Sequence, residues 1–238
     1  MRLVRSLSRV GLRLWFAAEF TRFISQQPRP DLTAPVTVEG SQQVRVLITG
    51  AGLGVGYGTR TAEDALAGQL ASVLHASLHR GVRVETRVEI ARPLRITVRD
   101  LIQRPALGYD LIIYTPAFGE AHHGHTAAWS KQLRTLIDTT RADDRNPSLV
   151  LTGLPTPRVK RPIEQIALEH ATRVNQVICD TAASTSTAYA AAPTYATPST
   201  YRIFDPDHYQ QFARSIARAA APLLGQSQQT ESPDPSAV

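Results

Sequence analysis

The sequence predicts an α/β domain with a parallel sheet and crossover helices. Apolar segments of strand type alternate with helical segments between Val44 and Gly153, an order typical of parallel strands joined by helices. The first of these segments ends in five glycines at alternate positions, from Gly50 to Gly58. In an α/β protein, the mouth that follows the first strand is where sites are built. The chain has 238 residues, 42% of them hydrophobic, which is enough for one domain with a sizeable core.

The segments follow one another as strand, helix, strand, helix, strand, helix and strand. In the second strand, at 82–90, Val and Ile alternate with charged residues. The other expected elements are strands ending at Gly50, at 110–115 and at 149–153, and helices at 63–70 and 129–134. Beyond them we expect a helix opened by Pro162 that ends at Asp180, a last short strand at 201–204 and a final helix at 208–224.

Composition sets the boundaries of the domain, which we place at 44–225. Residues 26–43 contain Pro28, Pro30 and Pro35 and are interpreted as a linker. Residues 181–200 are rich in Ala, Ser, Thr and Pro, which predicts a mobile loop. The polar residues 226–238 predict a disordered tail.

Met1–Ser25 predicts a basic amphipathic helix. Its arginines recur at intervals of three and four, which aligns them on one face opposite apolar residues. Arg13 and Glu19 interrupt the apolar core that a signal peptide needs, and the segment is too short and too charged to span a bilayer. One interpretation is a helix that lies on an anionic membrane surface; the other is a helix packed on its own domain or on a partner.

The glycine run admits two interpretations, and the first is nucleotide binding. Thr49-Gly50-x-x-x-Gly54-x-Gly56 resembles the phosphate loop of the short-chain dehydrogenases. The stricter Gly-x-Gly-x-x-Gly spacing is absent. The catalytic Tyr-x-x-x-Lys pair of that family is also missing, because neither Lys131 nor Lys160 follows a tyrosine at that distance.

The second interpretation covers more of the chain. Gly50, Gly56 and Gly58 match the first block of the SGNH/GDSL hydrolases, commonly Gly-Asp-Ser-x-x-x-Gly-x-Gly after a strand, and Asp205-Pro-Asp-His208 has the Asp-x-x-His spacing of the fifth block. Segments that resemble the intervening helices and strands follow in order, from about 44 to 219. The chain thus resembles an SGNH/GDSL hydrolase of actinobacterial type. This resemblance implies a three-layer αβα, flavodoxin-like fold and ester or acyl-bearing ligands.

The resemblance fails at the catalytic positions. Ala51 stands where the family has Asp, and Gly52 stands where it has the nucleophilic serine. By the same alignment, Arg95 falls at the second-block glycine and Gly119 at the third-block asparagine, two donors to the oxyanion. His208 and Asp205 remain as a remnant dyad, although the proline that usually follows the histidine is Tyr209. The aspartate and histidine have a structural alternative, a helix cap with a surface histidine. Arg95 is either a solvated side chain at a strand end or an anion ligand in the remnant pocket.

A second polar cluster comprises Glu120, His122, His123 and His125. Imidazoles and carboxylates can hold zinc, but no metal-site spacing is matched, so we expect solvated histidines and neither metal nor cofactor. The one cysteine, Cys179, is expected on an apolar helix face and suits a cytoplasmic location. The net charge of +6 comes without a nucleic-acid-binding motif, so nucleic-acid binding is not expected.

The sequence therefore predicts a diverged SGNH/GDSL protein that lacks serine-esterase activity and acts in binding or regulation, at the cytoplasmic membrane surface if the amphipathic helix binds lipid. Two alternatives stay open. One is an active acyl hydrolase with a non-standard site, such as His208 with a metal or water. The other is a nucleotide-binding protein that uses the loop Gly50–Gly58.

Overall fold

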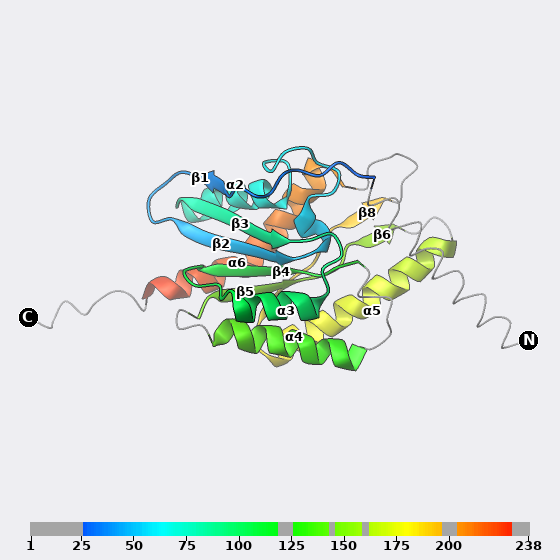
Figure 1. Cartoon of the computed structure of the whole chain (residues 1–238). Coiled ribbons are helices and arrows are strands. Elements are labelled where there is room, and N and C mark those ends of the chain that lie inside the picture. Colours follow the sequence, from blue (N-terminus) through cyan, green and yellow to red (C-terminus); the bar gives the residue numbers. More distant parts are fainter. Residues whose placement is uncertain (1–25, 119–125, 143–145, 159–161, 197–203, 230–238) are drawn as a thin grey trace, which may run out of the picture.

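The central sheet has six strands in the order β1-β3-β2-β4-β5-β7 (Figure 1). The computed structural model describes residues 26–118, 126–142, 146–158, 162–196 and 204–229. Five strands are parallel, and β1 pairs with β3 in the antiparallel direction. The strands are β1 (Val36–Val38), β2 (Val44–Gly50), β3 (Val82–Val88), β4 (Leu111–Thr115), β5 (Ser148–Thr152) and β7 (Ala188–Ala190).

The five parallel strands follow the flavodoxin-like order 2-1-3-4-5 when they are counted along the chain. In such a sheet the chain reverses direction between its first and third strands, here β2 and β4, and a crevice opens beyond their carboxyl ends. That crevice lies at Gly50 and Thr115, which pair with each other at the ends of the two strands. The glycine run therefore starts where the topology favours a site.

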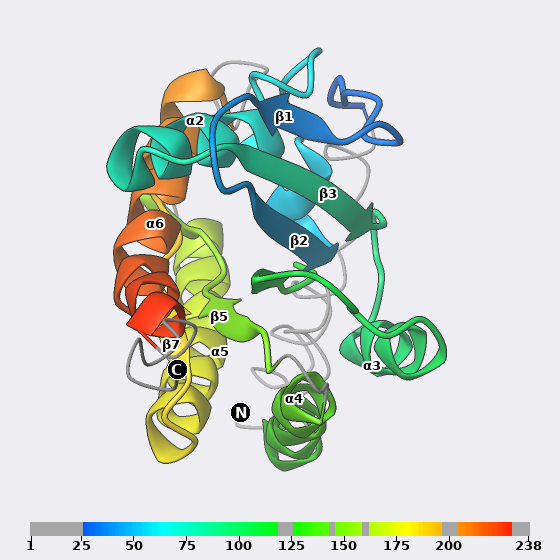
Figure 2. The same ribbon diagram turned by 90° about the vertical axis from the view of Figure 1, so that its left-hand side faces the viewer.

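Helices cover both faces of the sheet. They are α2 (Leu66–Leu78), α3 (Leu94–Gln103), α4 (Thr126–Arg141), α5 (Pro162–Ser184) and α6 (Pro206–Gln229), with a short 3-10 helix η1 (Gly52–Val55) after β2. Seen from the side, α2 and α6 lie on one face of the sheet and α3 and α4 on the other (Figure 2). A small two-stranded parallel sheet joins β6 (Thr156–Arg158) to β8 (Thr194–Ala196).

The alternation of side chains divides the core into two layers. In β2, Ile48 packs with α2 and α6, whereas its neighbour Leu47 packs with α3, α4 and α5. In β4, Ile113 packs in the layer of α2 and α6, and Ile112 packs in the layer of α3, α4 and α5. Successive side chains of a strand point to opposite faces, so apolar residues at every position give a sheet buried on both sides. The predicted three-layer αβα architecture is confirmed.

The structure places helices and strands inside segments that were expected to be irregular. The linker predicted at 26–43 contains β1, because Val36 and Val38 pair with the edge of β3. The first four residues of the tail predicted at 226–238 are helical, since α6 continues to Gln229. The mobile loop predicted at 181–200 contains the end of α5 and both β7 and β8. Cys179 is exposed instead of packed, one position beyond the fully buried Ile178.

Other predictions fall on residues that the structure does not describe. These are the amphipathic helix at 1–25, most of the strand predicted at 201–204, and the tail at 230–238. Within the described ranges, no helix is both long and apolar enough to cross a bilayer.

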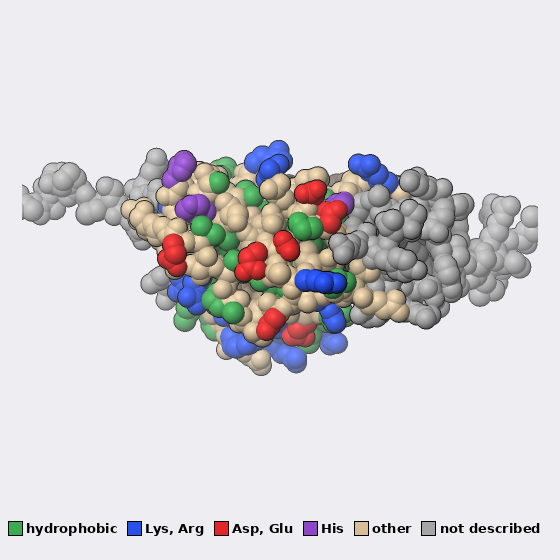
Figure 3. Space-filling view, turned by 90° about the horizontal axis from the view of Figure 1, so that it is seen from above, with side chains coloured by type: hydrophobic (Ala, Val, Ile, Leu, Met, Phe, Trp, Pro, Cys, Tyr) green, Lys and Arg blue, Asp and Glu red, His purple; other side chains and the backbone are tan. Residues whose placement is uncertain are grey.

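The face seen in Figure 3 carries acidic and basic side chains close together. On the described part of that face, the two signs of charge are therefore mixed.

Candidate functional site

The loop that follows β2 is buried against its own chain. All nine residues from Ala51 to Thr59 are buried. A side-chain carbon added at Gly50 would lie 2.2 Å from the carbonyl oxygen of Thr115, and one added at Gly58 would lie 2.2 Å from that of Phe204. Both glycines also have positive φ angles, of 110° and 86°, which other residues rarely adopt. The glycines therefore let backbone pack directly on backbone.

This packing explains the glycine run without a bound phosphate. Backbone amides of the loop donate to the chain's own carbonyls: Ala51 to Thr115, Gly54 to Ala51, and Gly58 to Pro28. A phosphate loop instead presents free amides to its ligand at the start of a helix. Here the loop leads into η1, which has only four residues. This geometry does not support the nucleotide-binding interpretation.

Gly52, where the resemblance expects the nucleophile, has no room for a side chain. Its φ is +55°, and an added side-chain carbon would lie 2.3 Å from the carbonyl oxygen of Pro116. Separations under 3.0 Å between such atoms are essentially never seen in real structures, and the neighbour here is backbone, which cannot swing aside. The loop conformation thus accommodates glycine at this position, and a serine there would be strained.

Aromatic side chains join the loop, the end of β4 and the start of α6. The Phe118 ring stacks on Phe204 at 6.3 Å between centroids and lies 6.3 Å from Tyr57. The Phe204 ring in turn meets the imidazole of His208 edge-on, also at 6.3 Å. The elements that carry the first, third and fifth blocks of the resemblance therefore meet at one edge of the sheet.

His208 and Asp205 form a close pair at the start of α6. His208 Nδ1 lies 2.6 Å from Asp205 Oδ1, and the backbone amide of His208 donates to the same oxygen at 3.0 Å. Burial alone would raise the pKa of Asp205, but these two bonds and the charge of the imidazole lower it below its usual value of 3.8. One carboxylate thus caps the helix and orients the imidazole, so the two interpretations of this pair are not exclusive.

Tyr209 replaces the proline that the resemblance expects, and it has a structural role. Its hydroxyl donates to the Tyr57 carbonyl oxygen at 2.8 Å, and the Tyr57 hydroxyl donates to the Ile90 carbonyl oxygen at 3.1 Å. Both rings are buried, which raises the pKa of Tyr57 to about 12 and the pKa of Tyr209 well above 10. These bonds tie α6 to the glycine loop.

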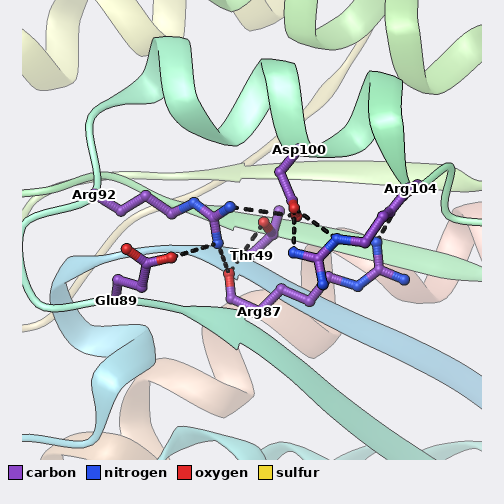
Figure 4. A network of polar contacts seen from close by, with 6 residues as sticks. All are labelled: Thr49, Arg87, Glu89, Arg92, Asp100 and Arg104. Atoms are coloured by element: carbon purple, nitrogen blue, oxygen red, sulfur yellow. Dashed lines mark hydrogen bonds and ion pairs between the residues drawn. The ribbon is translucent and has the colours of Figure 1, made fainter.

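The arginine near the glycine loop that is buried is Arg92, not Arg95. Arg95 is exposed in the first turn of α3, not at a strand end. The Arg92 side chain is only 5% exposed and lies between Asp100, Glu89 and the Arg87 carbonyl oxygen (Figure 4). Sequence reasoning missed this network, although a carboxylate at Asp100 on the buried face of α3 was a signal, since a buried charge needs a partner.

Solved structures share this architecture. A carbohydrate acetylesterase family member from Sinorhizobium meliloti matches with a TM-score of 0.59 at 16% identity, over 76% of this chain and 99% of that one. The inhibitor-bound aryl esterase of M. smegmatis matches with a TM-score of 0.60 at 15% identity, over 76% of this chain and 99% of that one. A structure named TesA matches with a TM-score of 0.57 at 15% identity, over 75% of this chain and 99% of that one. All three are SGNH/GDSL hydrolases. The chain has the SGNH hydrolase fold. No family model and no curated protein matches the sequence.

Some residues that the resemblance singles out in this SGNH fold lie outside the described ranges. Gly119, Glu120 and the histidines at 122, 123 and 125 are among them, so the predictions for the oxyanion position and the solvated histidines stay predictions. Elsewhere, the described residues hold no group of three or more His, Cys, Asp or Glu side chains placed to bind a metal ion.

Proposed function

We propose that the protein is an SGNH-fold binding protein without serine-esterase activity. The observation that carries this proposal is the conformation of Gly52. A hydrolase of this kind needs a hydroxyl that a histidine activates, and the backbone at Gly52 has a positive φ and the Pro116 carbonyl oxygen in the place of a side chain. Loss of one member of a triad that acts as a unit removes most of the catalysis.

The proposed ligand is a small molecule with an acyl or ester group, bound at the edge of the sheet where Tyr57, Phe118 and Phe204 meet. Two considerations support this. Phe118 and His208 are partly exposed beside the buried rings of Tyr57 and Phe204, and an apolar ring next to a single polar head suits a ligand that is mostly hydrocarbon. The solved relatives in fold are named as esterases. The predicted role at an anionic membrane, through Met1–Ser25, is part of the same proposal.

Hydrolysis of p-nitrophenyl acetate tests the loss of activity. The wild-type protein and the His208→Ala variant should both release p-nitrophenol at the rate of buffer alone. Turnover by the wild type that disappears in His208→Ala would overturn the proposal.

The same assay decides the second candidate, an acyl hydrolase with a non-standard site. That candidate is favoured by the 2.6 Å contact between His208 Nδ1 and Asp205 Oδ1, the geometry of a general base with its orienting carboxylate. A water molecule would then have to replace the missing serine as nucleophile. Activity that depends on both His208 and Asp205 would establish it.

A further inference from the structure

A pocket of about 620 Å³ lies at the outer edge of β3, next to η1. The antiparallel pairing with β1 covers only Val82–Val84 of β3. Beside the rest of the strand, the segment that leads to β1 runs past, and the Thr86 hydroxyl donates to the Leu32 carbonyl oxygen at 3.0 Å. The pocket is bounded by this segment, by the end of β3 and by the end of α3.

Four arginines line this pocket, namely Arg29, Arg87, Arg92 and Arg104. Of the acidic residues, Glu89 lines it, and Asp100 lies behind it, 8% exposed and paired with both Arg92 and Arg104. Four cations against these two carboxylates leave an excess of two positive charges. The remaining wall is largely apolar, from Pro30, Leu32, Val55 and Val88.

Arg92 is incompletely paired for a buried guanidinium. Its Nη1 lies 3.4 Å from Glu89 Oε1 and 3.2 Å from the Arg87 carbonyl oxygen. Its Nη2 lies 3.3 Å from Asp100 Oδ2, but that carboxylate oxygen receives no hydrogen bond, so the contact is an ion pair with poor hydrogen-bond geometry. Arg92 Nε has no hydrogen-bond partner in the part of the chain that the structure describes. Burying an arginine with unused donors is costly, and an added oxyanion would relieve the cost.

The Glu89 carboxylate is the partner of Arg92 that is free to move. Its side chain is 66% exposed, whereas that of Asp100 is 8% exposed and held on both sides. Figure 4 shows Glu89 and Asp100 on opposite sides of the Arg92 guanidinium. An ion pair whose carboxylate is this exposed is screened by water and contributes little to stability, so a ligand with better geometry can displace Glu89.

We propose that this pocket binds a small molecule that carries an oxyanion, a phosphate or a carboxylate, on an apolar body, and that the oxyanion displaces Glu89 from Arg92. Arginine is suited to both groups because its planar fork matches their paired oxygens. The apolar part packs on Leu32, Val55 and Val88. Pockets of this size take small ligands, and the inference holds whether or not the protein hydrolyses esters.

Isothermal titration of the full chain tests the proposal, with phenyl phosphate and benzoate as anionic probes and with phenol and benzamide as neutral ones. At least one anion should bind with a Kd of about 1 mM or tighter, as expected for ligands of so few atoms, and the neutral probes should bind much more weakly. Comparing phenyl phosphate with benzoate also separates phosphate recognition from carboxylate recognition. Added salt should weaken binding.

Two pairs of variants locate the site. Glu89→Gln should tighten binding by about fivefold, whereas Glu39→Gln, an exposed change of equal charge outside the pocket, should leave it unchanged. Arg29→Gln should weaken binding by about fivefold, and Arg60→Gln, also exposed, should not. All four positions are exposed, so the melting temperatures of the four variants should match that of the wild type. The proposal is overturned if neither anion binds, if the neutral probes bind equally well, or if Glu89→Gln behaves like Glu39→Gln.

Discussion

Placing a serine at Gly52 tests the physical argument against catalysis most directly. The change Gly52→Ser places a side chain on a backbone with φ of +55°, and its first carbon would lie 2.3 Å from the Pro116 carbonyl oxygen. A left-handed conformation costs a residue other than glycine roughly 1–2 kcal/mol. Relieving the overlap requires the backbone of η1 or of residues 116–118 to shift, which by analogy with overpacked cores costs roughly 1–3 kcal/mol.

The expected loss in the free energy of unfolding is therefore about 2–5 kcal/mol, a large part of the roughly 5–15 kcal/mol that holds a domain together. Chemical denaturation followed by tryptophan fluorescence and circular dichroism measures it. Gly52→Ala should lose a similar amount, because the cost lies in the first side-chain carbon and not in the hydroxyl. Gly225→Ala is the matched control: it lies inside α6 with no atom within 4 Å of the added carbon, and the change should stabilise the helix by roughly 0.5–1 kcal/mol.

Activity is the second readout. We expect that Gly52→Ser, alone or with Ala51→Asp, does not hydrolyse p-nitrophenyl acetate above background. The second change adds a carboxylate at a position that is fully buried, which carries a further cost. One missing oxyanion donor alone lowers the rate of a working hydrolase by an amount equivalent to about 2.7–4 kcal/mol. A Gly52→Ser protein that is as stable as the wild type, and whose esterase activity disappears on His208→Ala, would refute the reasoning.

Three further predictions concern the helix cap, the buried tyrosines and the N-terminus. Asp205→Ala should lower the free energy of unfolding by about 0.5–2 kcal/mol, whereas Asp205→Asn keeps the cap. The pKa of Asp205 is lowered on folding. The difference in stability between the wild type and Asp205→Asn should therefore be present above pH 4 and lost at lower pH. Since burial raises the pKa of Tyr57 to about 12, ultraviolet titration should show its ring protonated past pH 11, and stability should fall between pH 10 and 12, where the unfolded chain loses its proton first. Co-sedimentation with anionic liposomes should drop when the arginines at 5, 9 and 13 become glutamate, each worth about 1 kcal/mol; equal binding by a chain that starts at Asp31 would exclude this role for the N-terminus.

The regular part of the fold was predictable because its signals are local. An apolar residue at every position of β2 and β4 indicates strands buried on both faces, and the alternation with helices indicates parallel pairing. The edge strand β1 was missed because Val36-Thr-Val is short and follows a proline, and only pairing with β3 makes it a strand. The same holds for β7, which depends on β5.

Errors of one helical position are enough to reverse a burial prediction. In α5 the buried residues include Ala171, Val174, Ile178 and Ala182, at intervals of three and four. Cys179 lies one step beyond this face and is exposed. Arg92 and Arg95 differ in a similar way, although they are only three residues apart. Arg92 precedes α3 and its buried side chain pairs with Asp100 of that helix, whereas Arg95 is exposed on the helix. The alignment to a family pattern fixes the segment but not which arginine is buried.

The glycine run shows why the site was only half predictable. From the sequence, five alternate glycines indicate that the backbone closely approaches another group. A nucleotide phosphate and the oxyanion of an ester-hydrolysis intermediate both satisfy that expectation. In the structure, the groups that approach Gly50, Gly52 and Gly58 are the carbonyl oxygens of Thr115, Pro116 and Phe204, which belong to the end of β4 and the segments that follow it and precede α6. The contact that excludes a side chain at Gly52 joins the loop to the segment that carries Phe118, and the contact at Gly58 joins the same loop to the segment before α6. A side chain at position 52 would therefore disturb the packing of this edge of the sheet, so the close packing there and the glycine at position 52 have one physical cause.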